Sequence, residues 1–162
     1  IFTPWLHGNR CPFEDPNARG MFFNISLETG KSEMIRAVLE GVCYHLRWFL
    51  ETEEKKVKSS EKVRFVGGGA LSAVTSQILA DCTGRVVETV ASPQNVGAVG
   101  AAVLIAVNAG IIPSVQEAKK LIPAVNTYIP NKENKAVYDK NFEVFKKLYN
   151  SNKDNFAALN KN

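Results

Sequence analysis

The chain has 162 residues, of which 45% are hydrophobic and 22% charged, the balance of a globular protein with room for one domain and its core. Its formal charge is +4, and at the C-terminal end (132–162) lysines alternate with asparagine and glutamate, which favours a solvated helix face over a nucleic-acid-binding tail. No stretch approaches the roughly 20 apolar residues of a membrane-spanning helix.

The N-terminal segment (1–20) is predicted to be an entry loop outside the core, because prolines and glycines punctuate it throughout. The first five residues have neither an initiator Met nor the pattern of a signal peptide. We therefore expect a piece of a longer, cytoplasmic protein, and three unevenly spaced cysteines agree with a reducing compartment. Residues 21–27 alternate well enough to predict a strand.

The next segment is predicted to be a long helix that begins near Ser32 and ends at the lysines of 55–58. Ser32 and Glu33 supply a hydroxyl and a negative charge at its start, and the lysines complement the helix dipole at its end. Apolar residues recur at steps of three and four and form one stripe. The stripe consists of Ile35, Val38, Leu39, Val42, Leu46, Phe49 and Leu50.

Short strands and helices then alternate. Strands are predicted at 63–66 and 85–90, and helices at 71–82 and at about 96–109. The helix at 96–109 is small and apolar on all sides, which is typical of a buried helix.

A short helix (114–121), an extended link between Pro123 and Pro130, and an amphipathic C-terminal helix (131–162) are predicted to complete the chain. The alternation of strands and helices predicts an α/β domain with its core in residues 21–125. Strands should pair in parallel wherever a helix crosses over between them.

The sharpest candidate for a binding site is the turn that follows the strand at 63–66. Consecutive glycines let the backbone approach a ligand without a Cβ in the way, and the next helix offers free amide hydrogens at its positive end. A tight structural turn is the alternative. Ser72 stands where a dinucleotide-binding fingerprint requires a third glycine, so the turn alone does not identify the ligand. The turn contains Gly67, Gly68, Gly69 and Ala70.

Two other patterns fail on geometry. Gly30-Lys31-Ser32 resembles the end of a phosphate-binding loop, but Ile25 stands where that loop needs its first glycine. A zinc site has the right ligand types, but two of them lie two residues apart on the long helix and point about 200° apart. We therefore expect no metal site among His7, Cys11, Cys43 and His45.

Acid–base chemistry is sparse. Neither His7 nor His45 has a serine and aspartate partner pattern around it. Glu40 and Asp81 lie in predicted helices among apolar neighbours, and we expect them to be structural anchors instead of general bases. No catalytic residue is predicted. The sequence therefore indicates a ligand-binding part of a protein whose catalytic residues lie elsewhere.

Three segments, in the same order and spacing, resemble the FGGY family of carbohydrate kinases, and xylulokinases in particular. Residues 4–20 are similar to the family's Gly-x-Arg-x-Pro loop followed by Ala-Arg-Gly. Residues 20–40 are similar to its C-terminal signature at every specified position except Asn24, where the family prefers glycine. Residues 67–72 with 97–102 resemble its adenosine-binding segment and the small-residue helix behind it.

The resemblance implies a ribonuclease H-like, actin-like fold, in which two domains close over a cleft. It implies transfer of the γ-phosphoryl group of ATP to a sugar hydroxyl, with D-xylulose as the favoured sugar and Mg²⁺ held through the nucleotide. The family's general base is an aspartate of a preceding domain, and this chain has no match for it. Gly69 and Ala70 match positions that contact adenosine, Gly67 and Gly68 lie beside them, and Ser72 falls near a position that is often Asn.

We therefore expect the ATP-clamping half of a sugar kinase, inactive alone, with the sugar held mostly by the other half. The apolar face of a separated half also allows a homodimer. Two alternatives remain open: an FGGY kinase for ribulose, gluconate or glycerol, and a non-catalytic actin-like scaffold that binds nucleotide. Nucleic-acid binding through the basic tail ranks last.

Overall fold

The computed structural model describes residues 1–160, apart from the side chains at 118 and 119. Within that range the strands form two sheets, one made of β1 (Phe2–Thr3) and β2 (Met21–Phe22) and the other of β3 (Lys62–Phe65), β4 (Val86–Val90) and β5 (Ala124–Tyr128). The α-helices are α1 (Lys31–Glu54), α2 (Ala73–Thr83), α3 (Val96–Asn108), α4 (Ala118–Leu121) and α5 (Lys135–Asn160). The 3-10 turns η1 (Gly68–Leu71), η2 (Pro93–Asn95), η3 (Val115–Glu117) and η4 (Lys132–Asn134) precede α2 to α5 in turn.

The larger sheet has the order β3-β4-β5. β3 and β4 run parallel with α2 as the crossover, which confirms the predicted α/β unit. β5 lies antiparallel to β4, so the predicted extended link between Pro123 and Pro130 is in fact a strand of the sheet. The two prolines stand just outside β5, where they remove no ladder hydrogen bond.

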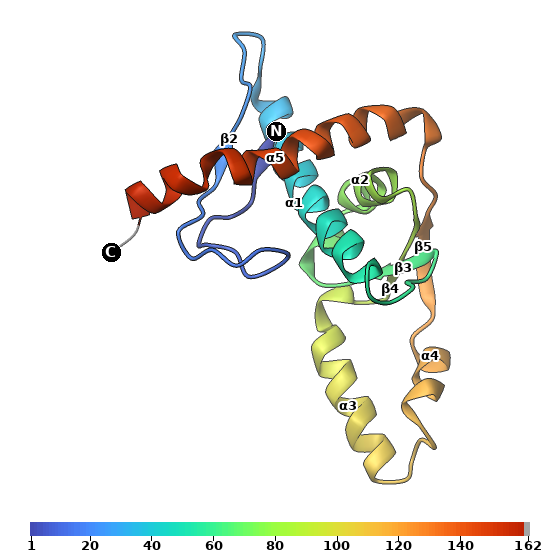
Figure 1. Ribbon diagram of the computed structural model, residues 1–162. Coiled ribbons are helices and arrows are strands. Elements are labelled where there is room, and N and C mark those ends of the chain that lie inside the picture. Colours follow the sequence, from blue (N-terminus) through green and yellow to red (C-terminus); the bar gives the residue numbers. More distant parts are fainter. Residues whose placement is uncertain (161–162) are drawn as a thin grey trace.

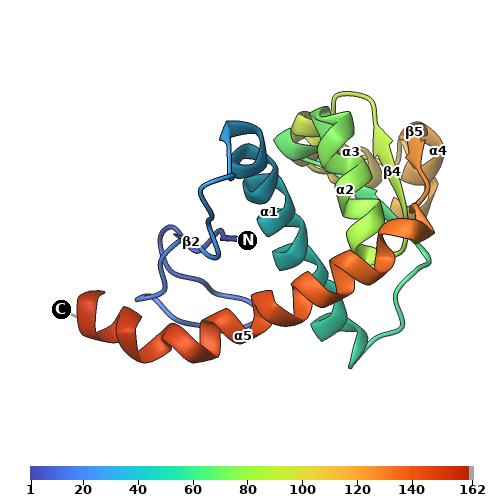
Figure 2. The same cartoon turned by 90° about the horizontal axis from the view of Figure 1, so that it is seen from above.

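The hydrophobic core lies where α1, α2 and α5 meet the N-terminal segment, and α5 contacts both other helices (Figure 2). Tyr44 of α1 and Phe145 of α5 are buried there, and the Phe145 ring lies 5.6 Å from the ring of Trp5. β1 crosses α1 at Gly41, where an added Cβ would lie 2.2 Å from the carbonyl oxygen of Phe2. This close crossing requires the glycine.

The prediction that residues 1–20 lie outside the core is therefore wrong. Trp5 and Ala18 are almost completely buried. The loop between them is held by its own side chains, and the Asn9 amide donates to the carbonyl of Phe13 at 2.8 Å. Prolines and glycines correctly indicate irregular backbone, but they do not report the burial of a large apolar side chain such as Trp5.

The predicted strand at 21–27 is also shorter than expected. Only Met21 and Phe22 pair with β1, and the backbone then turns at Asn24, which has a φ of 61°. Asparagine tolerates this left-handed conformation better than most residues. It can therefore stand where the kinase signature prefers glycine.

Helix α3 has the predicted bounds but not the predicted burial. Among its residues only Val103 is buried, and Gly97 and Gly100 have open space where a Cβ would be. Figure 1 shows α3 and α4 extending away from the sheet, which leaves the small-residue surface of α3 uncovered by the described part of the chain. Across residues 1–160, every helix lacks the length or the apolarity needed to cross a membrane.

Helix α1 begins at Lys31, one residue before Ser32, where its start was predicted. Gly30 is the N-cap, and the carboxylate of Glu33 accepts a hydrogen bond from the Gly30 N–H at 3.1 Å. The segment that resembles a phosphate-binding loop is thus a helix start whose first amide is already bound by an acidic side chain. The fully buried residues of α1 are Gly41, Cys43 and Tyr44. Of the predicted apolar stripe, Leu39 and Leu46 pack against the core, whereas Ile35, Val42 and Phe49 are exposed.

The pairing of Trp5 with His45 predicts acid sensitivity. The Trp5 indole N–H donates to His45 Nδ1 at 3.3 Å, so this nitrogen carries no proton, and burial lowers the pKa of His45 against a smaller opposing effect of the Cys11 backbone. Below about pH 6.5 the unfolded chain takes up a proton that the folded imidazole does not, and stability falls until the pH passes the lower folded pKa. We expect His45→Gln to flatten the loss of unfolding free energy between about pH 7 and pH 5, measured by urea denaturation.

The matched control is His7→Gln, at an exposed loop position, which should keep the wild-type profile. An unchanged acid slope in the His45→Gln variant would contradict this account of the pair.

Candidate functional site

The glycine turn connects the end of β3 to the start of α2. Its backbone is fixed at three points, which are all main-chain hydrogen bonds. The N–H of Gly67 donates to the carbonyl of Pro93 at 2.8 Å, Ala70 N–H donates to Gly67 at 3.2 Å, and Ser72 N–H donates to Gly69 at 3.2 Å. The turn is therefore a rigid main-chain surface at the carboxyl end of a parallel strand, where open α/β sheets bind ligands.

The three glycines are required for different reasons. Gly67 has a φ of +88°, which most side chains disfavour. An added Cβ at Gly69 would lie 2.9 Å from Cζ of Phe65. Gly68 has neither constraint: its φ is not positive, and nothing in the described chain lies within 4 Å of the position of its Cβ. The turn itself thus explains two of the glycines and leaves the exposed Gly68 free to meet something outside the chain.

The remaining predicted residues take up two different positions. Ala70 is buried and its N–H is bonded to Gly67, so it supports the turn from within. The hydroxyl of Ser72 caps α2 by accepting a hydrogen bond from Thr75 N–H at 3.2 Å, while its carbonyl accepts one from the Ser76 hydroxyl at 3.0 Å. Ser72 Oγ keeps its proton available as a donor.

The turn is brought next to the second glycine-rich stretch. The bond to Pro93 joins η1 to η2, and η2 leads directly into α3 with Gly97 in its first turn. Ser92, at the start of η2, has a φ of 48°, an uncommon conformation for a serine. Gly68 and Gly97 both present open backbone, so the structure places both parts of the predicted binding segment at one end of the sheet.

Two supporting residues were missed from the sequence. Phe65 lies beneath Gly69, and Pro93 holds the N–H of Gly67. The alternation of β3 indicates that Phe65 is half-buried, but not that its ring reaches forward under the turn. In the sequence, Pro93 indicates only the end of a strand. The fold shows that its carbonyl accepts the hydrogen bond from Gly67 N–H.

The predicted structural role of Asp81 is confirmed. Asp81 is buried in α2, and its carboxylate accepts hydrogen bonds from Asn131 N–H, the Asn134 amide and the Gln77 amide, each at 2.8 Å. The Gln77 amide also donates to the carbonyl of Ile129 at 2.9 Å. This carboxylate therefore holds the segment between β5 and α5 on α2.

Glu40 is also engaged, in this case between helices. Its carboxylate pairs with Arg36 at 2.8 Å and accepts a hydrogen bond from the Tyr138 hydroxyl of α5 at 3.3 Å. Burial, followed by the charge of Glu40, raises the pKa of Tyr138 to about 12, so the phenol keeps its proton. Both candidate carboxylates thus join elements of the fold.

The four residues weighed as zinc ligands are not gathered around one point. His45 Nδ1 accepts the Trp5 indole N–H, and the thiol of Cys43 faces the Thr75 carbonyl at 3.8 Å. Burial raises the pKa of Cys43 to about 12, which keeps the thiol protonated. Within residues 1–160 no group of three histidine, cysteine or acidic side chains is placed to hold a metal ion.

Known proteins match most of the chain. The model of the FGGY family of carbohydrate kinases, C-terminal domain, matches residues 1–109. The xylulose kinase of Escherichia coli strain K12 is 33% identical over 148 residues, which are 91% of this chain and 31% of that protein.

Solved structures agree. The ligand-bound xylulose kinase of Lactobacillus acidophilus superimposes with a TM-score of 0.88 at 28% identity, over 98% of this chain and 32% of that one. A gluconate kinase of the same organism gives 0.87, also at 28% identity and over the same shares. These overlaps confirm the predicted α/β fold, the C-terminal part of the ribonuclease H-like, actin-like fold. The chain spans about a third of the length of these relatives.

The contact between Phe65 and Gly69 can be tested by mutation. We expect Gly69→Ala to lower the free energy of unfolding by about 1–2 kcal/mol, because the Phe65 ring must move away from the new Cβ. Gly68→Ala, where the space is open, should change it by less than about 0.5 kcal/mol. In a Phe65→Leu background the cost of Gly69→Ala should shrink. Urea denaturation measures all of these, and equal costs in both backgrounds would rule out the contact.

Proposed function

We propose that this chain, which belongs to the FGGY family of carbohydrate kinases, is the C-terminal ATP-binding domain of a sugar kinase and supplies its adenosine-binding half. The kinases that it resembles are about three times as long. The transfer of a phosphoryl group from ATP to a sugar is therefore proposed for the whole polypeptide. This chain's part in it is the clamp on the nucleotide.

The observation that carries the proposal is the open backbone at Gly68. A residue with a strained φ or a crowded Cβ position must be glycine for the sake of the fold, but Gly68 has neither constraint. An exposed turn without a side chain lets a flat ring or a ribose lie against the main chain. The position and orientation of that surface are set by the other residues of the proposed adenosine site, which are Gly67, Gly69, Ala70 and Ser72.

The clamp fits the physical chemistry of phosphoryl transfer. This reaction depends mainly on positioning and on stabilisation of charge, so a rigid main-chain surface that orients ATP contributes without an acid or base of its own. Mg²⁺ would be held through the phosphates of the nucleotide and would neutralise their charge. The general base would come from the part of the kinase outside residues 1–162, and closure of the two halves would exclude water.

We propose D-xylulose as the sugar, since the motifs and the first relatives point to xylulose kinases. Gluconate is the main competitor, because the gluconate kinase superimposes almost equally well at the same identity. Parallel assays of the full polypeptide with D-xylulose, ribulose, gluconate and glycerol decide between them. The highest kcat/KM for any sugar except D-xylulose would overturn this assignment.

Nucleotide binding is tested most sharply at Gly68. We expect Gly68→Val to weaken ADP binding by the full kinase at least tenfold, about 1.4 kcal/mol, because a branched side chain occupies the proposed adenosine surface. The matched control is Gly84→Asn, at the end of α2, where the left-handed conformation suits asparagine. Titration calorimetry measures both variants, with urea denaturation to confirm unchanged folding. Wild-type ADP affinity in the Gly68→Val variant would remove the basis of the proposal.

The division of labour is tested by separating the halves. Residues 1–162 alone should phosphorylate no pentulose, whereas the full polypeptide should release ADP from ATP only when a sugar is present. A coupled ADP-release assay measures this. Turnover by the isolated chain would contradict the inference that residues 1–162 lack the general base. Sugar-independent ADP release by the full polypeptide would favour the actin-like scaffold.

A further inference from the structure

Residues 91–123 form an arm that leaves the sheet at the end of β4 and returns to it at the start of β5. The arm contains α3 and α4, and Figure 1 shows both helices extending away from the sheet. Along α3 most side chains are open to solvent, and Leu104 and Ile105 are 62% and 69% exposed. Because the arm buries little of its surface in the described chain, its direction is set mainly at its base.

The base of the arm is held on both sides by β3. On the outgoing side, the N–H of Gly67 donates to the carbonyl of Pro93 at 2.8 Å. On the returning side, Nη1 of Arg64 donates to the carbonyl of Ile122 at 2.9 Å. The register of the sheet brings these two sides together, since the last residue of β4 is paired with the first residue of β5. One strand therefore holds both ends of the arm.

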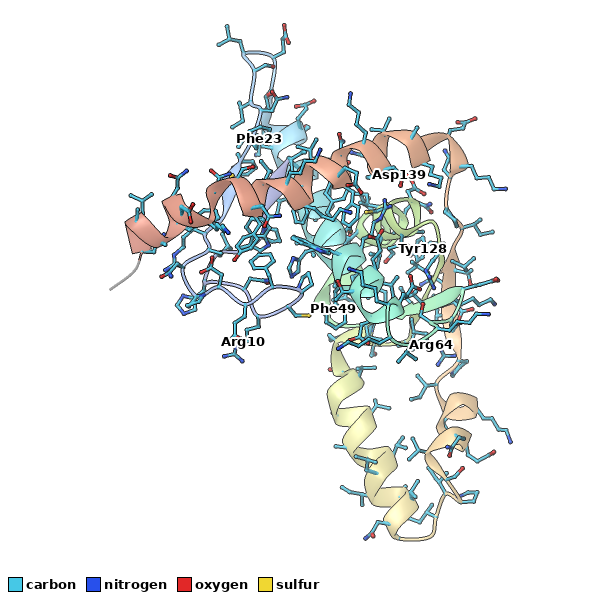
Figure 3. The ribbon with its side chains drawn as sticks, viewed as in Figure 1. Arg10, Phe23, Phe49, Arg64, Tyr128 and Asp139 are labelled. Carbon is cyan, nitrogen blue, oxygen red and sulfur yellow. The ribbon has the colours of Figure 1, made fainter. Side chains whose placement is uncertain are left out.

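The side chain of Arg64 is oriented by an ion pair on the same face of the sheet. Its Nε lies 3.8 Å from Oε2 of Glu88, the residue opposite it on β4, while Lys62 reaches the other oxygen of that carboxylate at 3.1 Å. A planar guanidinium donates in fixed directions to two acceptors at once, which a lysine ammonium does less well. Glu88 thus steadies the guanidinium while Nη1 binds the arm. Figure 3 labels Arg64 at the end of the sheet from which α3 and α4 extend.

We propose that Arg64 is a positioning residue of the nucleotide site. The arm begins with η2 and the first turn of α3, which carry the second glycine-rich stretch of that site. A tilt of the arm at its base would move Gly97 relative to Gly68 and so change the surface on which ADP or ATP lies. By bonding the returning end at Ile122, Arg64 prevents this tilt without touching the nucleotide. This role rests on the proposed function, since it presupposes that a nucleotide binds at the two glycine-rich stretches.

The nucleotide affinity of the full kinase polypeptide tests this role. We expect Arg64→Met to weaken ADP binding, measured by titration calorimetry, by about threefold to tenfold, and to raise KM for ATP by a similar factor. Both kcat and KM for the sugar should stay within about twofold of wild type, because the arm holds neither the sugar nor the general base. Arg64→Lys keeps a donor for the Ile122 carbonyl and should recover part of the lost affinity.

The matched control is Lys62→Met. Lys62 lies on the same face of β3 and pairs with the same carboxylate, but it stands two residues, about 7 Å, further from the end of the strand. This variant loses the same charge and should keep its ADP affinity within about twofold of wild type. Equal weakening by both methionine variants would assign the effect to charge instead of the bond to Ile122, and would overturn the proposal. A loss of stability in urea for Arg64→Met at unchanged ADP affinity would also overturn it.

Hydrogen exchange of the wild-type polypeptide gives a second measurement that needs no variant. If the base of the arm and the nucleotide are linked, saturating ADP should slow exchange of the amides of 120–126, at the returning end of the arm, by at least about threefold. Exchange there that is unchanged by ADP would overturn the role of Arg64, even if Arg64→Met fails to fold.

Gly68→Val, measured alongside, keeps the two proposals apart. Wild-type ADP affinity in that variant would refute the nucleotide site itself. Weak binding by Gly68→Val together with normal binding by Arg64→Met would refute only the positioning role of Arg64.

Discussion

A main-chain hydrogen bond from Gly67 to Pro93 connects the two stretches on which the proposed site depends. It joins the end of β3 to the turn before α3, so that two glycine-rich segments about thirty residues apart in the sequence reach the same end of the sheet. Gly67, which donates this bond, adopts a positive φ that most side chains disfavour. Phe65 then supports the next part of the turn from below. The result is a bare backbone surface of fixed shape.

Some of this arrangement could be predicted from the sequence. The parallel crossover of β3, α2 and β4 follows from local signals that all agree: a strand pattern, glycines, a cap at Ser72 and the left-handed Gly84 at the end of α2. The same holds for the long helices. The glycine turn could also be singled out, because three consecutive glycines exceed what a simple turn requires. Its individual roles could not, because they depend on the Phe65 ring and the Pro93 carbonyl.

The predictions of burial that were wrong share one physical cause. A sequence pattern shows which environment a residue prefers, but it does not show which neighbour the residue contacts in the fold. Trp5 lies in irregular backbone, yet it is buried because α5 brings Phe145 against it. The small residues of α3 and three residues of the α1 stripe, Ile35, Val42 and Phe49, have the pattern of buried surfaces, yet they are exposed in this chain. On α3 and at the exposed residues of α1, the described residues supply no covering layer.

Two acidic residues, the buried Asp81 and the half-buried Glu40, have structural roles instead of catalytic ones. A general base needs a lone pair that is free to take the substrate's proton. The Asp81 carboxylate accepts three hydrogen bonds from the segment before α5 and from its own helix, and Glu40 is shared by Arg36 and Tyr138. Removing the Glu40 carboxylate would leave the buried Tyr138 hydroxyl without this acceptor, at a cost of about 1–3 kcal/mol. Removing the Asp81 carboxylate would release the donors of Asn131, Asn134 and Gln77. These side chains are therefore committed to holding α5 against α1 and α2, and the proposed nucleotide site is a shaped backbone surface without a reactive group.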